Sequence, residues 1–223
     1  AYSTETRHGA NEWKRVRARL MKSGVELDHQ RLVLSMPDHN DNFAALPIIA
    51  ALNDFELVGE ENEVSYNFPD LAERFQSMAL PEAIGNESLA NWEKRRLTDF
   101  SVMAAEMGFA SDIPHFEVLT WISNFEKEIR EIDRASRLPN AVMKTRFSED
   151  LYEMISAPIP HMRDLIHFQK FQSVRACAAL EAGEYEEAAS AERVMLQIAQ
   201  TSGSEPMLVS HLVSQNTLGQ ALN

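Results

Sequence analysis

The chain contains few of the residues that build covalent or metal-held scaffolds. Cys177 is the only cysteine among 223 residues, so an intrachain disulfide and a cysteine-rich zinc site are both excluded. It falls between Val174 and Ala178 on an expected apolar helix face, with no histidine at helical reach. This placement favours a buried structural thiol over a nucleophile.

Glycine is also scarce, at 8 residues, and the sequence has no P-loop, GxGxxG, GxSxG or kinase-like motif. Loops that cradle phosphate rely on glycine, so nucleotide binding is disfavoured. The 7 histidines provide no HExxH and no pair spaced i, i+4. His161 and His167 are six residues apart, which would place them on different faces of a helix. We therefore expect no metal, no cofactor and no identifiable catalytic residue.

One polar loop needs separate treatment because its spacing is similar to that of a calcium site. Asp38, Asn40 and Asn42 have the one-three-five spacing that opens an EF-hand loop. However, Phe43 and Ile49 occupy the positions that require glycine and a bidentate glutamate. Helix capping and Asx turns are the favoured roles for these side chains.

Positive charge is in short supply, since 34 acidic side chains face 21 basic ones and the net charge is −13. Such an acidic protein would be repelled by a nucleic-acid backbone, and no basic stripe with interleaved aromatics offsets this. The densest basic run, 14–19, lies on an expected amphipathic helix over 11–23. A solvated helix face is the favoured interpretation of that run, and peripheral contact with an anionic membrane is the alternative. No apolar stretch reaches ~18 residues, so no transmembrane segment is predicted.

Helical periodicity is what the chain has in abundance, and its 44% hydrophobic content can fill a core. We predict a first helix over about 11–23, capped by Asn11 and ended by Gly24. Four of its side chains follow the spacing of a core-facing stripe: Trp13, Val16, Leu20 and Met21. After a loop at 36–42, a second helix is expected through about Leu52.

The region 54–80 interrupts this pattern and predicts one short β-hairpin or an irregular excursion. Helical order returns from Ser88 to Gly108. The predicted fold class is therefore all-α, an irregular multi-helix domain of helical hairpins. We expect an N-terminal helical and loop segment over 1–81 and a helical-hairpin domain over 82–223, with one continuous domain as the alternative.

A helix over about 115–137 carries the most regular apolar pattern. Its core positions step by four, three, four and three residues: Val118, Ile122, Phe125, Ile129 and Ile132. These form a narrow seam that faces one partner helix. A coiled coil needs three or four heptads, and this seam has about two and a half, so an intramolecular helix pair is favoured. The seam is nevertheless our candidate interaction site.

The C-terminal third predicts a helical hairpin, with helices over about 161–182 and up to Gln200. Small alanines precede Gly183, and acidic residues follow it where the next helix begins. The segment 176–188 resembles the turn of a tetratricopeptide hairpin. Only one such unit lies near 165–200, whereas a solenoid needs about three. A last helix carries Leu208, Leu212 and Leu218.

A wider pattern runs through Trp13, 37–38, 42–47, 160–165, Gly183, Ala188 and 205–213. In these segments the chain resembles a family of uncharacterised, exported or membrane-anchored helical proteins common in Planctomycetes and Verrucomicrobia. The family has no assigned activity, so the resemblance implies no catalytic residues. The resemblance implies a periplasmic or cell-envelope location, with any membrane anchor in a segment outside this chain. It also implies that the chain is a processed or truncated part of a longer protein. A cytoplasmic location stays open.

Together these observations favour a non-catalytic helical scaffold or interaction subunit of a larger, extracytoplasmic assembly. Its partners would be other protein subunits or further copies of itself, without nucleic acid. The alternative is an all-α hydrolase or ligand-binding domain with a pocket between helices. Two catalytic carboxylates can lie anywhere in a sequence, so the absence of a motif leaves that alternative open. A peripheral membrane subunit that uses 11–23 is a third hypothesis.

Overall fold

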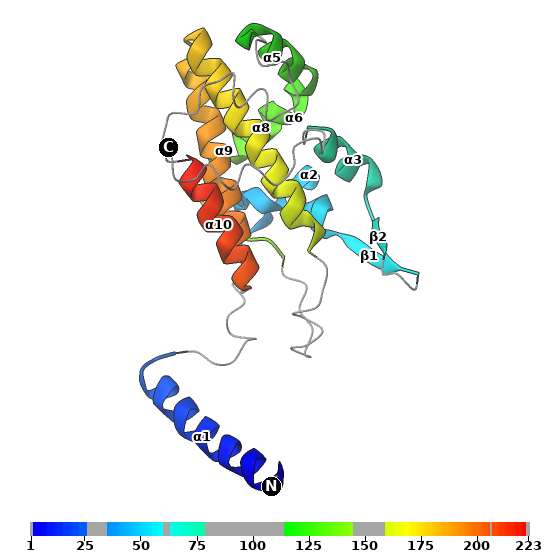
Figure 1. Cartoon of the computed structure of the whole chain (residues 1–223). Coiled ribbons are helices and arrows are strands. Elements are labelled where there is room, and N and C mark those ends of the chain that lie inside the picture. Colours follow the sequence, from blue (N-terminus) through cyan, green and yellow to red (C-terminus); the bar gives the residue numbers. More distant parts are fainter. Residues whose placement is uncertain are drawn as a thin grey trace. The chain divides into compact units, whose positions relative to one another are not determined.

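The computed structural model describes residues 2–25, 35–59, 63–78, 114–144, 159–205 and 207–221. The chain forms two compact units, Ala1–Ser35 and Met36–Asn223. Helices dominate the described residues, and one two-stranded sheet accompanies them (Figure 1). The predicted all-α fold class with a short β-hairpin is confirmed. The helix expected over 88–108 and the expected boundary at 81/82 lie outside the described residues.

In residues 2–25 the first unit forms helix α1, Tyr2–Lys22, followed by a turn. The predicted start at 11, with Asn11 as the cap, is wrong, because the helix already runs through the preceding nine residues. The predicted end is confirmed: Gly24 has φ 82°, and the Val25 amide donates to the Leu20 carbonyl at 3.0 Å. This left-handed closure favours glycine. The predicted core-facing stripe is wrong for Trp13 and Met21, which are 56% and 59% exposed.

The second unit opens with short turns instead of the single helix expected up to Leu52. They are η2 His39–Asp41, η3 Phe43–Ala45, α2 Pro47–Ala50 and η4 Ala51–Asn53. Pro47 explains the interruption, because the residue before a proline is pushed out of the helical region and Leu46 has ψ 128°. The predicted capping role of Asp38 is confirmed, since its Oδ1 accepts from the Asn40 amide at 2.9 Å.

The β-hairpin pairs β1, Phe55–Val58, with β2, Glu63–Tyr66, in antiparallel register. Phe55 lies opposite Tyr66, and their rings meet edge to face. Helix α3, Pro69–Met78, follows directly. The sheet is thus a small appendage that leads the chain into α3, as Figure 1 shows.

The segment expected as one helix over 115–137 is divided into α5, His115–Ile122, a 3₁₀ turn η6, Ser123–Phe125, and α6, Glu126–Ala135. The uninterrupted helix is therefore a wrong prediction. Ser123 Oγ donates to the Thr120 carbonyl at 2.6 Å, and Asn124 Nδ2 donates to the Trp121 carbonyl at 2.8 Å. Such local side-chain bonds compete with the regular helical ladder and favour a tightened turn.

The predicted hairpin of the C-terminal third is confirmed. Helix α8, Pro160–Ala182, ends at Gly183 in the left-handed conformation, and α9, Tyr185–Gly203, returns beside it. Helix α10, Leu208–Ala221, packs against α9 and α8 (Figure 1). The core surrounds α8, where Phe168 stacks on Phe171 at 5.6 Å and lies 4.6 Å from Phe75 between ring centroids.

Candidate functional site

The predicted interaction seam lies inside the second unit. Val118 and Ile132 are fully buried, and Ile122, Phe125 and Ile129 are at most 6% exposed. All five belong to the core that α8 and α9 complete, because α5 packs on α8 and α6 on α9. This agrees with the favoured intramolecular helix pair. The side chains are not on the surface, so another protein could reach them only if this core opened.

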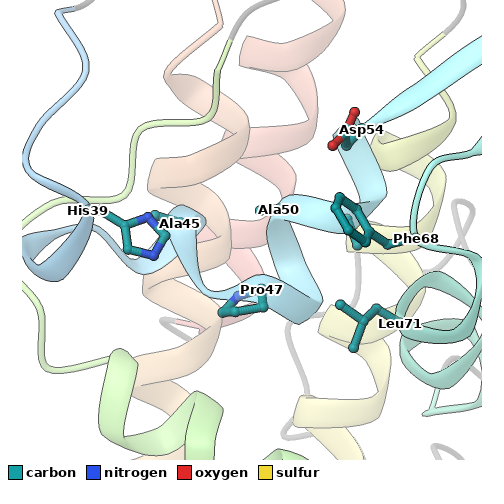
Figure 2. A pocket seen from close by; sticks show the side chains of 8 residues that line it. His39, Ala45, Pro47, Ala50, Asp54, Phe68 and Leu71 are labelled. Carbon is teal, nitrogen blue, oxygen red and sulfur yellow. The ribbon is translucent and has the colours of Figure 1, made fainter.

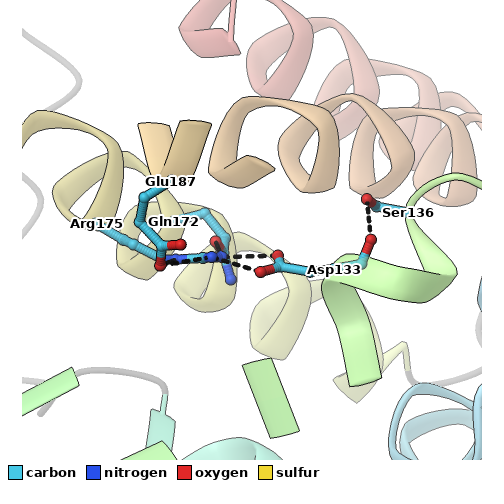
Figure 3. Close-up of polar contacts among 5 residues, drawn as sticks. All are labelled: Asp133, Ser136, Gln172, Arg175 and Glu187. Carbon is cyan, nitrogen blue, oxygen red and sulfur yellow. Dashed lines mark hydrogen bonds and ion pairs between the residues drawn. The ribbon is translucent and has the colours of Figure 1, made fainter. Parts of the chain in front are cut away.

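A charged cluster links three helices within the same unit (Figure 3). Arg175 of α8 is fully buried and donates to both carboxylate oxygens of Asp133 on α6, at 2.9 and 2.6 Å. Its Nε donates to Glu187 of α9 at 2.8 Å, and Gln172 accepts a further bond at 3.0 Å. Burial opposes the charge of Arg175, but the hydrogen bonds to both carboxylates outweigh it and raise the pKa of the guanidinium. The cluster fixes helix positions and offers no reactive group.

A second buried polar cluster contains the residue types of a hydrolase. His161 Nε2 lies 3.0 Å from Glu205 Oε1, without the alignment of a hydrogen bond, and Ser210 Oγ donates to Glu205 Oε2 at 3.1 Å. Nucleophilic catalysis needs the serine bonded to the histidine. Here both residues contact the same carboxylate, and each of the three is at most 3% exposed. The geometry fits a structural link between α8 and α10.

A shallow hollow of about 180 Å³ lies beside α2 (Figure 2). Its wall is mostly carbon and includes Pro47, Phe68 and Leu71. Ligand pockets usually measure ~300–1,000 Å³ and present several converging polar groups. Asp54 is the one carboxylate that lines this hollow, and it accepts a bond from Asn67 Nδ2 at 2.7 Å. The hollow therefore does not favour the ligand-binding alternative.

The remaining candidate is α10, whose inward face is small and polar. Ser210 and Thr217 are fully buried, and Thr217 Oγ1 donates to Gln169 of α8 at 2.7 Å. At Gly203 of α9, an added Cβ would lie 2.8 Å from Ser214 Oγ. Small residues at these positions let α10 approach α8 and α9 closely, and Leu212 and Leu218 lie on the exposed side of the helix.

We call the exposed side of this helix the α10 outer face. It consists of five exposed residues: Val209, His211, Leu212, Gln215 and Leu218. Leu212 is 58% and Leu218 42% exposed. The stretch 207–221 contains no aspartate, glutamate, lysine or arginine, although such residues make up 25% of the chain. A helix face that exposes three apolar side chains and none of these charged residues is a candidate interaction surface.

The leucines of the last helix are evident in the sequence, but the side of the helix that stays exposed is not. The weak amphipathicity of α10 gives little indication of which side is buried. The charge-free run over 207–221 was the available signal, because surface helices of soluble domains normally carry charged side chains.

Within the parts of the chain that the structure describes, no three histidine, cysteine, aspartate or glutamate side chains lie close enough to hold a metal ion. None of the helices in these parts is both long enough and apolar enough to cross a membrane. In comparisons with known proteins, no protein-family profile, no curated protein and no solved structure matches the chain. The tetratricopeptide and wider family resemblances accordingly stay predictions.

Proposed function

We propose that the chain is a non-catalytic helical scaffold, and that its α10 outer face docks a second copy of the same chain. One observation carries the proposal: α10 turns Leu212 and Leu218 outward and Ser210 and Thr217 inward, on a stretch without aspartate, glutamate, lysine or arginine. Burying an apolar side chain contributes ~1.5–3 kcal/mol, so covering the exposed part of Leu212 contributes about 1 kcal/mol. A second chain would supply that cover.

Charge supports a second copy as the occupant. Each chain carries a net charge of −13, so like charges oppose most ways in which two copies could meet. The α10 outer face has no aspartate, glutamate, lysine or arginine, so the repulsion between two copies is least there. A two-fold axis would set the same face of each copy against the other.

The size of the face determines the expected strength. Helix α10 has 14 residues and is therefore about 21 Å long. A contact confined to one pair of such helices falls below the ~1,200 Å² that stable complexes usually bury. We expect a reversible dimer with a dissociation constant on the order of 10 µM, equivalent to about 7 kcal/mol. Charge repulsion between the two chains opposes this dimer, so added salt should strengthen the association.

Sedimentation equilibrium of the full chain over a concentration series tests the proposal. Leu212→Glu would place a carboxylate in the centre of the contact and should weaken association at least tenfold. Leu180→Glu is the matched control, because Leu180 near the end of α8 is 53% exposed and the substitution changes the net charge equally. A chain that is monomeric at every concentration, or that loses association equally in both variants, contradicts this docking.

The all-α hydrolase or ligand-binding alternative lacks a comparable observation. In the described ranges, its nearest residues are His161, Glu205 and Ser210, whose geometry does not activate the serine. A measurable hydrolytic rate that His161→Gln abolished without loss of folding would revive it.

A further inference from the structure

Helix α1 differs in charge from the rest of the protein. Residues 12–25 contain five basic side chains and one acidic side chain, a net charge of +4. The whole chain has −13, so all other residues together carry −17. The acidic side chain, Glu12, lies 3.7 Å from Arg15. Positive charge is therefore concentrated on one helix of a strongly acidic protein.

Apolar side chains share that helix in an ordered way. At about 100° per residue, Trp13, Val16 and Leu20 fall within an arc of about 60°. Trp13 is 56% exposed, and Val16 and Leu20 are half-buried. Lys14, Arg15 and Lys22 are exposed on the opposite half of the helix, and Arg17 and Arg19 are exposed along the two borders of the stripe. The first unit thus presents an amphipathic helix with an apolar stripe and a basic face.

We propose that α1 binds the surface of an anionic lipid bilayer and lies in the plane of that surface. Trp13, Val16 and Leu20 would enter the boundary between headgroups and acyl chains. The basic side chains would remain among the headgroups, as their long stems allow. With 21 residues, α1 would extend about 31 Å along the membrane. This inference is independent of the α10 outer face.

The combination of charges and apolar groups favours lipid over nucleic acid. A phosphate backbone would attract the basic face, but it offers no apolar region for Trp13 and Leu20. At a bilayer both faces are satisfied, and tryptophan prefers the boundary between water and lipid. The acidic remainder of the chain opposes binding, but salt screens charges beyond about 8 Å at physiological ionic strength.

Co-sedimentation of the full chain with vesicles tests the proposal. We expect binding to phosphatidylcholine vesicles that contain about one third phosphatidylserine, weaker binding to phosphatidylcholine alone, and release by high salt. Each Lys or Arg near such a surface contributes about fivefold to partitioning. Arg15→Glu with Arg19→Glu should therefore reduce binding at least about twentyfold. Circular dichroism would verify that the variant retains its helix content.

A matched double variant separates the helix from the total charge. Lys127→Glu with Arg137→Glu changes the net charge by the same amount, at exposed positions of the second unit. This variant should bind anionic vesicles within about threefold of the native chain. Brominated lipid should quench the tryptophan fluorescence of the native chain, and Trp13→Phe should remove most of that quenching. Three results would overturn the proposal. The two double variants could lose vesicle binding equally, or the native chain could bind neutral and anionic vesicles with equal affinity. The chain could also bind an oligonucleotide but no vesicles.

Discussion

Removing the Asp133 carboxylate should destabilise the second unit, because it takes the bidentate partner away from a fully buried arginine. Asp133 on α6 accepts hydrogen bonds from both terminal nitrogens, Nη1 and Nη2, of the buried Arg175, at 2.9 and 2.6 Å. In Asp133→Ala, Arg175 would keep Glu187 and Gln172 as acceptors but would lose its bidentate partner. The guanidinium is fully buried, so water cannot replace the missing carboxylate without rearrangement of the helices.

The magnitude follows from burial. Breaking a fully buried pair by removing one partner costs about 3–5 kcal/mol. Asp133 is 21% exposed and Arg175 retains Glu187, so we expect a loss of about 2–3 kcal/mol in the free energy of unfolding. Arg175→Met should cost less, about 1–2 kcal/mol, because it leaves only the partly exposed carboxylates of Asp133 and Glu187, which water can reach.

Urea unfolding followed by circular dichroism gives these free energies. Glu126→Ala is the control, because it breaks the exposed ion pair with Arg130 on the same helix, and exposed pairs contribute at most about 1 kcal/mol. The expected order of destabilisation is Asp133→Ala, then Arg175→Met, then Glu126→Ala. If Asp133→Ala and Glu126→Ala agree within about 0.5 kcal/mol, burial does not strengthen this cluster and the reasoning fails.

Three further predictions concern packing and titration. Gly203→Ala should lower the free energy of unfolding by about 1–2 kcal/mol, because the new Cβ would meet Ser214 Oγ at 2.8 Å. In the same urea assay, the double variant Gly203→Ala with Ser214→Gly should recover part of that loss. Burial, and to a smaller extent the nearby Asp164 carboxylate, raises the pKa of the Tyr66 phenol from 10.0 to about 12. An ultraviolet titration should therefore show a step near pH 12, and Tyr66→Phe should remove that step. The folded state then holds the phenol proton more tightly, so the stability that Tyr66 contributes is complete below pH 10 and is lost as the pH rises towards 12. Burial and the charge of Glu181 raise the pKa of the Cys177 thiol. At neutral pH a thiol reagent should therefore react with Cys177 more slowly in the native protein than in urea. Equal reaction rates in the two conditions would contradict this prediction.

Local patterns predicted the elements that depend on near neighbours in the sequence. Gly183 takes the left-handed conformation that ends α8, and the sequence anticipated this from a glycine after an alanine-rich helix. The short β-hairpin was also anticipated, from the loss of helical periodicity after Asp54. In the seam, apolar spacing indicated the buried side of α5 and α6, although the polar side chains of Ser123 and Asn124 divide the helix.

Polar contacts over long distances in the sequence could not be predicted in the same way. Asn42 had the position of a capping residue, yet its side chain pairs with both backbone groups of Val142, at 2.9 Å each. The buried pairing of Arg175 with Asp133 spans 42 residues of the chain. Periodicity describes one element at a time, so it does not reveal which polar groups meet in the core.

The sequence by itself determined the all-α class, the helical hairpin around Gly183, the uncharged stretch over 207–221 and the concentration of basic residues on α1. These are properties of composition and local spacing. Only the tertiary structure decided that the predicted seam is internal and that Leu212 is external. The reason is physical: the seam has large apolar partners on α8, whereas Gly203 and the buried acceptor Gln169 suit the small polar side of α10. Which face of a helix is buried depends on its neighbours as well as on its own residues.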